Sequence, residues 1–372
     1  MTVDVEALRR RFPRVAIAHE WLTIPGGSEK VVLEILELFP HAEIFTSVYH
    51  PEPWPEAITS RPVHASFLQR IPGATRHYPK LLPLMDRAFR SFDLRGFDLV
   101  ISSNHACAKN VRVPAGVPHV CYCHTPMRYA WDPAFLAAED LGRVERALLP
   151  ALTAWLRRVD RKRAAGPTVF VANSSHVAER IRRHYGRDAV VIHPPVEVER
   201  FLALERRPGD AYLVFGRLVP YKRAGDAVRA CALLPRPLRV AGDGRARAQL
   251  EAEAPAGIEF LGFVPDGRMG ELLAGSRALL FPGEEDFGIV PVEAQAAGLP
   301  VVAYGSGGVR DSVRDGATGV LYEPAGPDAL ARAIERFESM SFDEGELRAQ
   351  ARRFTPEVFR ERFAALVAEL AA

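Results

Sequence analysis

Two glutamates lie on either side of a short loop in residues 283–308, with a spacing that suits a diphosphate and sugar hydroxyls. Glu285 precedes the loop, and Glu293 lies in the first turn of a helix that we predict from Pro291. The loop consists of Phe287, Gly288, Ile289 and Val290. Because N–H groups at a helix N-terminus attract anions, we expect a diphosphate here, with both carboxylates accepting hydrogen bonds from hydroxyls. The alternative is that both glutamates are surface charges that complement the helix dipole.

Arg217 and Lys222 lie five residues apart on either side of Pro220, so both cations can point at one anion. Lysine binds phosphate as a compact charge, whereas arginine binds it as a fork. Only five of the 48 basic residues are lysines, which makes a lysine at this position unusual for the chain. We expect the pair to face an anion; the alternative is two solvated loop cations.

Two further polar residues come at or after the ends of apolar segments that we predict as strands. His124 ends the strand 119–124, and Lys109 follows the strand 98–103 as a cation that can meet an acceptor or a phosphate. Cys123 precedes His124, but adjacent strand residues face opposite sides, which argues against a Cys–His nucleophile. The alternative for His124 is a buried histidine with satisfied hydrogen bonds.

Short β-rich segments alternate with helical segments along the chain, which predicts parallel sheets with crossover helices. The first set of predicted strands comprises residues 15–21, 42–48, 98–103, 119–124 and 168–174. A second set follows at residues 212–218, 238–244, 258–264, 278–283, 300–305 and 319–324. We therefore predict an α/β fold of two doubly wound, Rossmann-like domains facing an interdomain cleft, with ligands at the carboxyl ends of the strands.

The two prolines of 193–201 mark the boundary between these sets. We predict an N-terminal domain over 1–195 and a second domain over 196–354. The segment 355–372 carries an apolar stripe at helical spacing, so we expect a final helix that packs back on the first domain.

Residues 285–302 read E-x-F-G-x-x-x-x-E-A-x-A-x-G-x-P-V-V and precede a glycine pair, a pattern that resembles the signature of glycosyltransferase family 4. Members of this family are retaining enzymes of the GT-B fold that use nucleotide-sugar donors. Four other segments resemble family motifs in the correct order, and they are P-G-G (25–27), F-G-R-L-V-P-Y-K (215–222), A-G-D-G (241–244) and L-G-F-V (261–264). The resemblance therefore covers nearly the whole chain, and it implies that 1–195 is the acceptor-side domain and 196–354 the nucleotide-sugar-binding domain.

The resemblance implies roles for individual residues. His124 contacts the transferred sugar, Arg217 and Lys222 neutralise the leaving diphosphate, and Glu285 holds the donor sugar. The implied donor-binding residues are Gly26, Gly27, Gly216, Gly242, Phe263, Val264, Phe287, Gly288, Ile289, Val290 and Glu293. The family's usual proposal is a front-side displacement, in which a β-phosphate oxygen of the donor takes the acceptor proton, so we expect no metal, no cofactor and no carboxylate nucleophile.

Two strings narrow the resemblance to bacterial surface-polysaccharide enzymes, many of which are mannosyltransferases that use GDP-mannose. The strings are H-T-P-x-R-Y-x-W at 124–131 and HEWLTIPGGSEKV at 19–31. They imply a GDP-mannose donor and place Arg128 and Trp131 near the acceptor or the donor sugar. The alternative for Trp131 is packing in the core.

The composition excludes several other classes of protein. The chain has 372 residues, is 48% hydrophobic and carries a net charge of +2, which argues against a disordered chain and a dedicated nucleic-acid binder. Its four cysteines suit buried thiols in a reducing compartment. The N-terminal residues carry acids without the apolar run of a signal peptide, and no segment has 18 consecutive apolar residues. We expect a cytoplasmic protein, or one attached to the inner face of the membrane.

Residues 143–166 are basic and carry interleaved leucines and a tryptophan. Such a segment can lie on an anionic membrane that presents a lipid-linked acceptor. The alternative is an ordinary helix with a solvated face.

We therefore predict a retaining, metal-independent transferase that moves a hexosyl group, namely mannose from GDP-mannose, to a hydroxyl of a glycan or a lipid-linked acceptor. One alternative is a UDP-sugar-dependent transferase that acts on a natural product or another small molecule. Another is a noncatalytic protein that binds nucleotide sugars. An epimerase of the same fold is disfavoured by the E-x-F-G loop.

Overall fold

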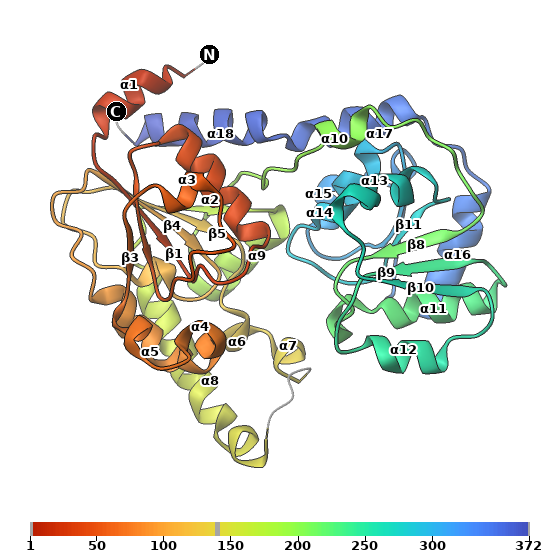
Figure 1. Ribbon diagram of the computed structural model, residues 1–372, viewed down its shortest axis with the longest axis horizontal. Helices are drawn as coiled ribbons and strands as arrows, with labels where there is room; N and C mark the ends of the chain where they lie inside the picture. Colours follow the sequence, from red (N-terminus) through yellow and green to blue (C-terminus); the bar gives the residue numbers. More distant parts are fainter. Residues whose placement is uncertain (1–2, 138–141, 371–372) are drawn as a thin grey trace. The chain divides into compact units, whose positions relative to one another are not determined.

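The computed structural model describes residues 3–137 and 142–370, and the chain divides into two units (Figure 1). Unit 1 comprises residues 1–195 together with 356–372. Unit 2 comprises residues 196–355. The chain thus leaves unit 1 at Pro195 and returns to it at helix α18 (Pro356–Glu369).

The described part of unit 1 is built on a seven-stranded parallel sheet in the order β3-β2-β1-β4-β5-β6-β7. Its strands are β1 (Val15–His19), β2 (Glu43–Thr46), β3 (Val63–Ala65), β4 (Leu99–Asn104), β5 (His119–Cys123), β6 (Val169–Ala172) and β7 (Ala189–Val191). The order reverses between β1 and β4, where His19 pairs in register with Ser103. A doubly wound sheet binds ligands at this switch point, at the carboxyl ends of the strands.

Helices cover both faces of this sheet, and its central strands β1, β4 and β5 are accordingly buried on both sides. On one face, Val15 and Ile17 pack with α1 (Val5–Arg11), α2 (Gly27–Leu38) and α18. On the other, the core includes side chains of α5 (Leu82–Arg90), α8 (Arg143–Arg163) and α9 (Ser175–Tyr185). Phe359 and Phe363 of α18 are fully buried, so the last helix completes the core of unit 1. The shorter helices are α3 (Glu56–Thr59), α4 (Ala74–His77), α6 (Arg128–Trp131) and α7 (Pro133–Ala137).

The described part of unit 2 repeats this design with six parallel strands in the order β10-β9-β8-β11-β12-β13. They are β8 (Tyr212–Phe215), β9 (Leu238–Ala241), β10 (Ile258–Gly262), β11 (Leu279–Phe281), β12 (Val301–Tyr304) and β13 (Gly319–Tyr322). The order reverses between β8 and β11, so the switch point of unit 2 lies there.

Helices also cover both faces of the second sheet. One face packs against α11 (Ala224–Leu233), α12 (Arg247–Glu253) and α16 (Pro327–Glu338). The opposite face packs against α10 (Glu199–Leu202), α13 (Asp266–Ala274), α14 (Ile289–Ala296), α15 (Val309–Ser312) and α17 (Glu344–Ala351). The predicted α/β class with two doubly wound parallel sheets is therefore confirmed.

Two details of the fold differ from the sequence-based expectations. The edge strands β3 and β7 were not expected, since each has only three residues and its side chains are only partly buried. Helix α14 begins at Ile289, two residues before Pro291, so Ile289 and Val290 belong to its first turn and not to the loop. Proline is tolerated there because the first helical N–H groups have no partner within the helix.

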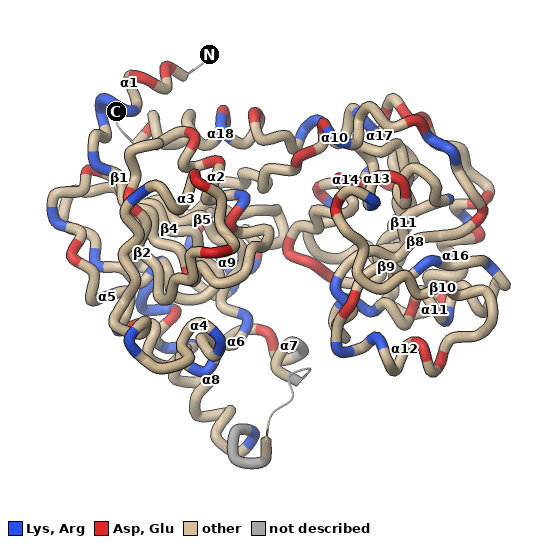
Figure 2. The backbone as a smooth tube through the Cα atoms, in the orientation of Figure 1, with Lys and Arg blue, Asp and Glu red and all other residues tan. Residues whose placement is uncertain are grey.

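Charges of both signs are interspersed along the backbone of each unit, in line with the net charge of +2 (Figure 2). Within the described residues, no helix combines the length and apolar character needed to span a bilayer.

Candidate active site

Lys222 and Glu285 meet at the switch point of unit 2. The Lys222 Nζ lies 2.8 Å from Glu285 Oε1, and about a fifth of each side chain is exposed. Both residues line one hollow together with Gly216, Arg217 and Gly283. The structure thus brings together three of the four residues predicted as catalytic, two cations and one carboxylate.

Glycines allow the backbone segments around this hollow to pack closely. A Cβ on Gly242 would lie 1.9 Å from the carbonyl oxygen of Gly216, so no side chain fits at Gly242. A Cβ on Gly283 would lie 2.8 Å from the Cα of Lys222. Gly216 is more open, because its Cβ would meet only the Lys222 Nζ at 3.4 Å. Gly242 and Gly283 therefore hold the loops together, whereas Gly216 keeps space beside the ammonium group.

The loop that carries Glu285 is held by the glycine pair after β12. The N–H of Gly308 donates to the carbonyl oxygen of Glu285 at 2.8 Å. A Cβ on Gly307 would lie 2.3 Å from that same oxygen. The glycine pair of the sequence pattern thus fixes the backbone of Glu285 and leaves its carboxylate to Lys222.

The N-terminus of α14 follows this loop. Gly288 precedes the helix with a φ of 86°, in the left-handed region that favours glycine. The Phe287 side chain is buried against Phe354, with ring centroids 5.4 Å apart, so only its backbone can face a ligand. Glu293 is 5% exposed, and its Oε1 lies 3.4 Å from Nη2 of Arg200. Ile289 and Val290 are half-buried.

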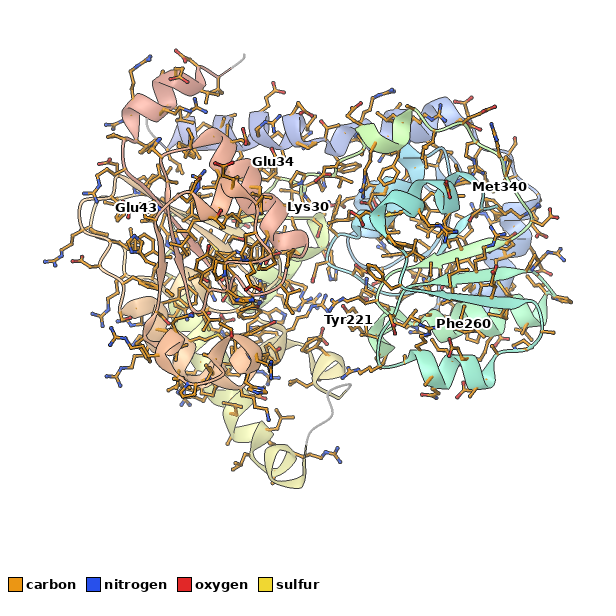
Figure 3. The ribbon with its side chains drawn as sticks, viewed as in Figure 1. Lys30, Glu34, Glu43, Tyr221, Phe260 and Met340 are labelled. Atoms are coloured by element: carbon orange, nitrogen blue, oxygen red, sulfur yellow. The ribbon has the colours of Figure 1, made fainter. Side chains whose placement is uncertain are left out.

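Arg217, Phe263 and Val264 complete the predicted set in unit 2. Arg217 is exposed, and its Nη2 donates to the hydroxyl of Tyr221 at 3.4 Å; Tyr221 is labelled in Figure 3. Phe263 is 77% exposed and shares a second hollow with the half-buried Val264 and Arg268. An aromatic ring with this exposure offers a face on which a planar ligand can stack.

The switch point of unit 1 contains a chain of polar groups that ends at His124. Ser103 Oγ lies 2.8 Å from Nε2 of His124 and 3.1 Å from Nδ1 of His19. His19 Nε2 lies 3.1 Å from Oε1 of Glu29 on α2. Of these four residues only His124 was predicted as a site residue. The signal for His19 and Ser103 was a polar residue at the carboxyl end of an apolar strand, whereas Glu29 lies in the first turn of α2 and had no such signal.

A second buried carboxylate shapes the loop after β4. Glu20 has no exposed surface, and its carboxylate accepts four backbone N–H groups at 2.7–3.1 Å. The donors are His105, Ala106, Cys107 and Ala108. Such a nest of N–H groups is an anion site, and here the chain's own carboxylate fills it.

The glycines of the P-G-G segment begin α2. Gly26 is the N-cap residue and Gly27 the first helical residue, and both are exposed. A Cβ on Gly26 would lie 3.1 Å from Oε2 of Glu29, so this loop runs close to the buried carboxylate. Gly26, Glu29 and His19 therefore belong to one end of unit 1.

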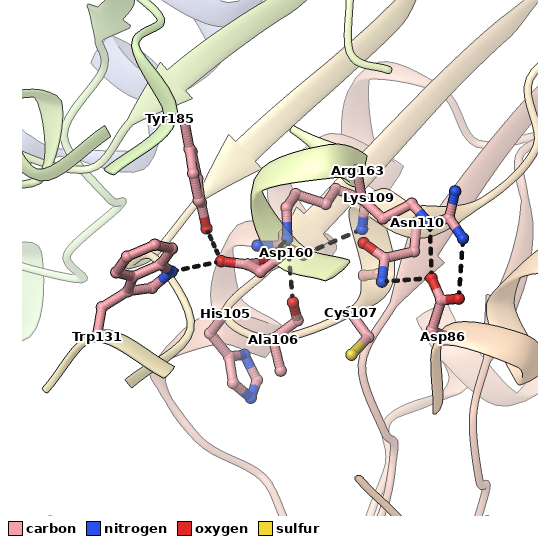
Figure 4. Close-up of polar contacts among 12 residues, drawn as sticks. Asp86, His105, Ala106, Cys107, Lys109, Asn110, Trp131, Asp160, Arg163 and Tyr185 are labelled. Atoms are coloured by element: carbon pink, nitrogen blue, oxygen red, sulfur yellow. Dashed lines mark hydrogen bonds and ion pairs between the residues drawn. The ribbon is translucent and has the colours of Figure 1, made fainter. Parts of the chain in front are cut away.

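The position of Lys109 corrects its predicted contact with an acceptor or sugar. Its side chain has no exposed surface, and its ammonium group pairs with the fully buried Asp160 and donates to Ala106 O at 3.2 Å (Figure 4). Burial lowers the pKa of Lys109, but Asp160 raises it more, so the net shift is upward and the group is charged. Lys109 therefore has a structural role, because its charge is already neutralised inside unit 1.

Trp131 belongs to the same buried network. Its indole N–H donates to Oδ2 of Asp160 at 2.6 Å, and Tyr185 donates to that oxygen at 2.8 Å. The Trp131 ring stacks on His184 with centroids 4.5 Å apart. These contacts favour the packing alternative for Trp131. Arg128 lies 3.9 Å from Asp132 and stays partly exposed.

No group of three His, Cys, Asp or Glu side chains within residues 3–137 and 142–370 is arranged to hold a metal ion. All four cysteines are buried, and none forms a disulfide.

Two protein families match this chain in succession. Residues 25–200 match the family described as Glycosyltransferase Family 4, and residues 196–357 match Glycosyl transferases group 1. The D-inositol 3-phosphate glycosyltransferase of Streptomyces scabiei is 32% identical, over 60% of this chain and 55% of the relative. The 2-deoxystreptamine glucosyltransferase of Streptomyces kanamyceticus is 31% identical, over 59% of this chain and 61% of the relative. The chain thus spans little more than half the length of these curated relatives.

Solved structures share the fold over most of the chain. Anabaena HepE in complex with UDP superposes with a TM-score of 0.68 over 96% of this chain and 100% of its own, at 19% identity. Sucrose-phosphate synthase from Thermosynechococcus elongatus gives a TM-score of 0.70 over 96% and 98%, at 17% identity. These likenesses establish the GT-B fold for the two doubly wound sheets.

Proposed function

We propose that this chain, whose residues 25–200 and 196–357 match two glycosyltransferase families, transfers a hexosyl group from a nucleotide sugar to a hydroxyl group. The observation that carries the proposal is the Lys222–Glu285 pair at the switch point of unit 2. A leaving nucleoside diphosphate develops negative charge, which a fixed cation stabilises. A carboxylate beside that cation can orient the hydroxyls of the sugar that the diphosphate carries.

The other residues of unit 2 have roles that suit the same ligand. Arg217 adds a second cation, and the N–H groups around Gly288 add a helix N-terminus. Glu293 on α14 lies 3.4 Å from Arg200, and we propose it as a partner of a sugar or ribose hydroxyl. Reaction without a metal is part of this proposal, because two cations and a helix terminus supply positive charge at the diphosphate. Retention is also part of it, on the resemblance to glycosyltransferase family 4.

The first donor to test is GDP-mannose, with a glycan or lipid-linked hydroxyl as acceptor. Two strings around His19 and His124 support this choice, since they resemble enzymes of bacterial polysaccharide assembly. His124 is the residue of unit 1 that we propose contacts the transferred sugar.

The second candidate is a UDP-sugar with a small-molecule acceptor. It is supported by the names of the relatives, which act on D-inositol 3-phosphate and on 2-deoxystreptamine. It is also supported by the structures of HepE with UDP and with UDP-glucose.

Helix α8 supports a peripheral contact with an anionic membrane. Leu148 is 61% exposed and Trp155 38% exposed on this helix. A hollow of about 580 Å³ lies along it, next to four basic side chains, Arg157, Arg158, Arg161 and Lys162. Flotation with vesicles that contain or lack anionic lipid tests this contact, and binding that ignores the lipid charge contradicts it.

The decisive experiment measures hydrolysis and transfer with GDP-mannose, UDP-glucose and UDP-N-acetylglucosamine in parallel. We expect turnover with one donor and its loss in Glu285→Ala. Binding without turnover of any donor, in the presence of an acceptor panel, would support the noncatalytic alternative. If no nucleotide sugar binds or reacts, the proposed function is wrong.

A further inference from the structure

Four polar groups in the interior of unit 1 form a continuous hydrogen-bonded chain from Glu29 to His124. They come from four segments far apart in sequence: α2, β1, β4 and the residue after β5. His19 and Ser103 are fully buried, and Glu29 is 4% exposed, whereas His124 is half-buried. This series of hydrogen bonds therefore connects the buried Glu29 to His124, the histidine that we place at the substrate.

The charge of Glu29 determines which group donates and which accepts in this series of hydrogen bonds. Burial raises the pKa of Glu29, but the hydrogen bond and the charge of His19 lower it more, to about 2. An ionised carboxylate only accepts hydrogen bonds, so Nε2 of His19 carries the proton in that contact.

The remaining bonds follow when both imidazoles are neutral. Nδ1 of His19 then has no proton and accepts from the hydroxyl of Ser103 at 3.1 Å. The single proton of that hydroxyl is thereby used, so Ser103 Oγ accepts from Nε2–H of His124 at 2.8 Å. His124 is left as the Nε2–H tautomer, and its Nδ1 can only accept a hydrogen bond.

We propose that Glu29, His19 and Ser103 are positioning residues that hold the ring of His124 and fix its tautomer. The inference rests on the proposed function, because it gives His124 a substrate to contact.

The same strand supplies a matched control. Ser102 precedes Ser103 on β4 and faces the opposite side of the sheet. Its hydroxyl lies 2.9 Å from Nε2 of His119, which is 1% exposed. Ser102→Ala therefore removes the same kind of buried Ser–His contact as Ser103→Ala, on the face away from His124.

The first test is spectroscopic and needs no substrate. In protein labelled with ¹⁵N-histidine at about pH 8, where an ordinary imidazole is neutral, the ring nitrogens of His124 report its tautomer. Comparison with His124→Gln assigns the signals. We expect the Nε2–H form in the wild type and in Ser102→Ala, and a mixture of tautomers in Ser103→Ala.

Glu29→Gln adds a second variant that keeps the size of the side chain. An amide can either accept from His19 or donate to it, so we expect this change also to mix the tautomers of His124. A mixture in the wild type, or a single tautomer retained in both Ser103→Ala and Glu29→Gln, would overturn the proposal.

The second test is kinetic. We expect Ser103→Ala to lower kcat by roughly 10- to 100-fold while the KM for the donor changes by less than about threefold, as when outer partners of a functional histidine are removed. Ser102→Ala should keep its kcat. The positioning role would be overturned if Ser103→Ala mixed the tautomers of His124 and yet left kcat unchanged. Absence of transfer by the wild type would instead count against the proposed function, and the spectra would still decide the tautomer.

Discussion

The carboxyl ends of the two sheets hold their charged groups by different means. In unit 1, Glu20 and Glu29 are buried carboxylates whose partners come from the protein itself, backbone N–H groups for one and His19 for the other. In unit 2, Lys222 and Glu285 are partly exposed and face each other, and the loops that carry them are held by close backbone contacts at glycines.

The loops at the ends of the strands are thus fixed in two different ways in two sheets of the same doubly wound type. A buried carboxylate with several hydrogen bonds fixes a loop permanently, because any unpaired donor left in the interior costs free energy. Glycine contacts fix a loop without using its polar side chains, so these stay available to a ligand. Unit 1 therefore uses its buried carboxylates for internal order, whereas unit 2 leaves Lys222 and Glu285 partly exposed, as the proposed binding role requires.

The largest effect should come from Glu20→Ala, which removes the acceptor of four buried N–H groups. At about 1 kcal/mol for each unpaired donor, we expect unit 1 to lose about 4 kcal/mol of its unfolding free energy. Denaturation followed by tryptophan fluorescence measures this, because all four tryptophans lie in unit 1, namely Trp21, Trp54, Trp131 and Trp155. Glu285→Ala is the control and should leave the unfolding transition of unit 1 unchanged. If Glu20→Ala lowered the unfolding free energy by less than about 1 kcal/mol, the buried carboxylate would not have the structural role that distinguishes unit 1 from unit 2.

The next effect concerns the glycine contacts of unit 2. We expect Gly242→Ala to destabilise this unit by about 3 kcal/mol, since the added Cβ would lie 1.9 Å from the oxygen of Gly216 and the φ of 133° disfavours a side chain. Hydrogen exchange of the β8 and β9 amides measures the loss. Gly267→Ala in α13 is the control, because its Cβ meets nothing within 4 Å, and it should be neutral or stabilising. If the β8 and β9 amides were equally protected from exchange in both variants, Gly242 would not be needed for the close backbone contact.

A smaller effect tests whether the charges of unit 2 are kept for a ligand. We expect Lys222→Ala to weaken the binding of GDP or UDP by about 2 kcal/mol, which is the scale of one charge-assisted hydrogen bond. Calorimetric titration measures the affinity, with the exposed Lys80→Ala of unit 1 as the control. The same affinity in Lys222→Ala and wild type would remove this lysine from the site.

The smallest predicted effect is a gain in binding affinity, whereas the preceding ones are losses of stability or affinity. Glu285→Gln removes the carboxylate that pairs with Lys222, so we expect a nucleoside diphosphate without sugar to bind up to about 1 kcal/mol more tightly. The turnover of the complete donor should fall in the same variant. Glu284→Gln is the matched control, because the neighbouring carboxylate accepts from Ser306 instead. Weaker binding of the diphosphate in Glu285→Gln would show that the pair acts as one structural element.

The sequence predicted the topology well because strands of a doubly wound sheet are short, apolar and separated by helices. It missed β3 and β7, since edge strands bury only part of their side chains and carry a weaker apolar signal. Lys222 and Glu285 were identified because local motifs place them, and the structure brings them together. Their binding roles and those of the other site residues stay predictions.

Lys109 shows that a local motif does not reveal a partner that is distant in the sequence. Its partner Asp160 lies 51 residues further along the chain on α8, so nothing near Lys109 indicated a buried ion pair. The Glu29–His19–Ser103 contacts escaped notice for a similar reason, because Ser103 lies 84 residues from His19 in the sequence, although His19 and Glu29 are only ten residues apart. Contacts between distant polar residues have no periodicity, and a lone strand-end histidine or serine does not indicate its partner.

The place of α18 in unit 1 has a consequence for synthesis of the chain. Phe359, Phe363 and three further buried side chains of α18 complete a core whose remaining members precede residue 196. A ribosome therefore delivers every residue of unit 2 before it delivers the last helix of unit 1. The unit that begins first can reach its final packing only after the other has been made, so the order of folding need not follow the order of translation.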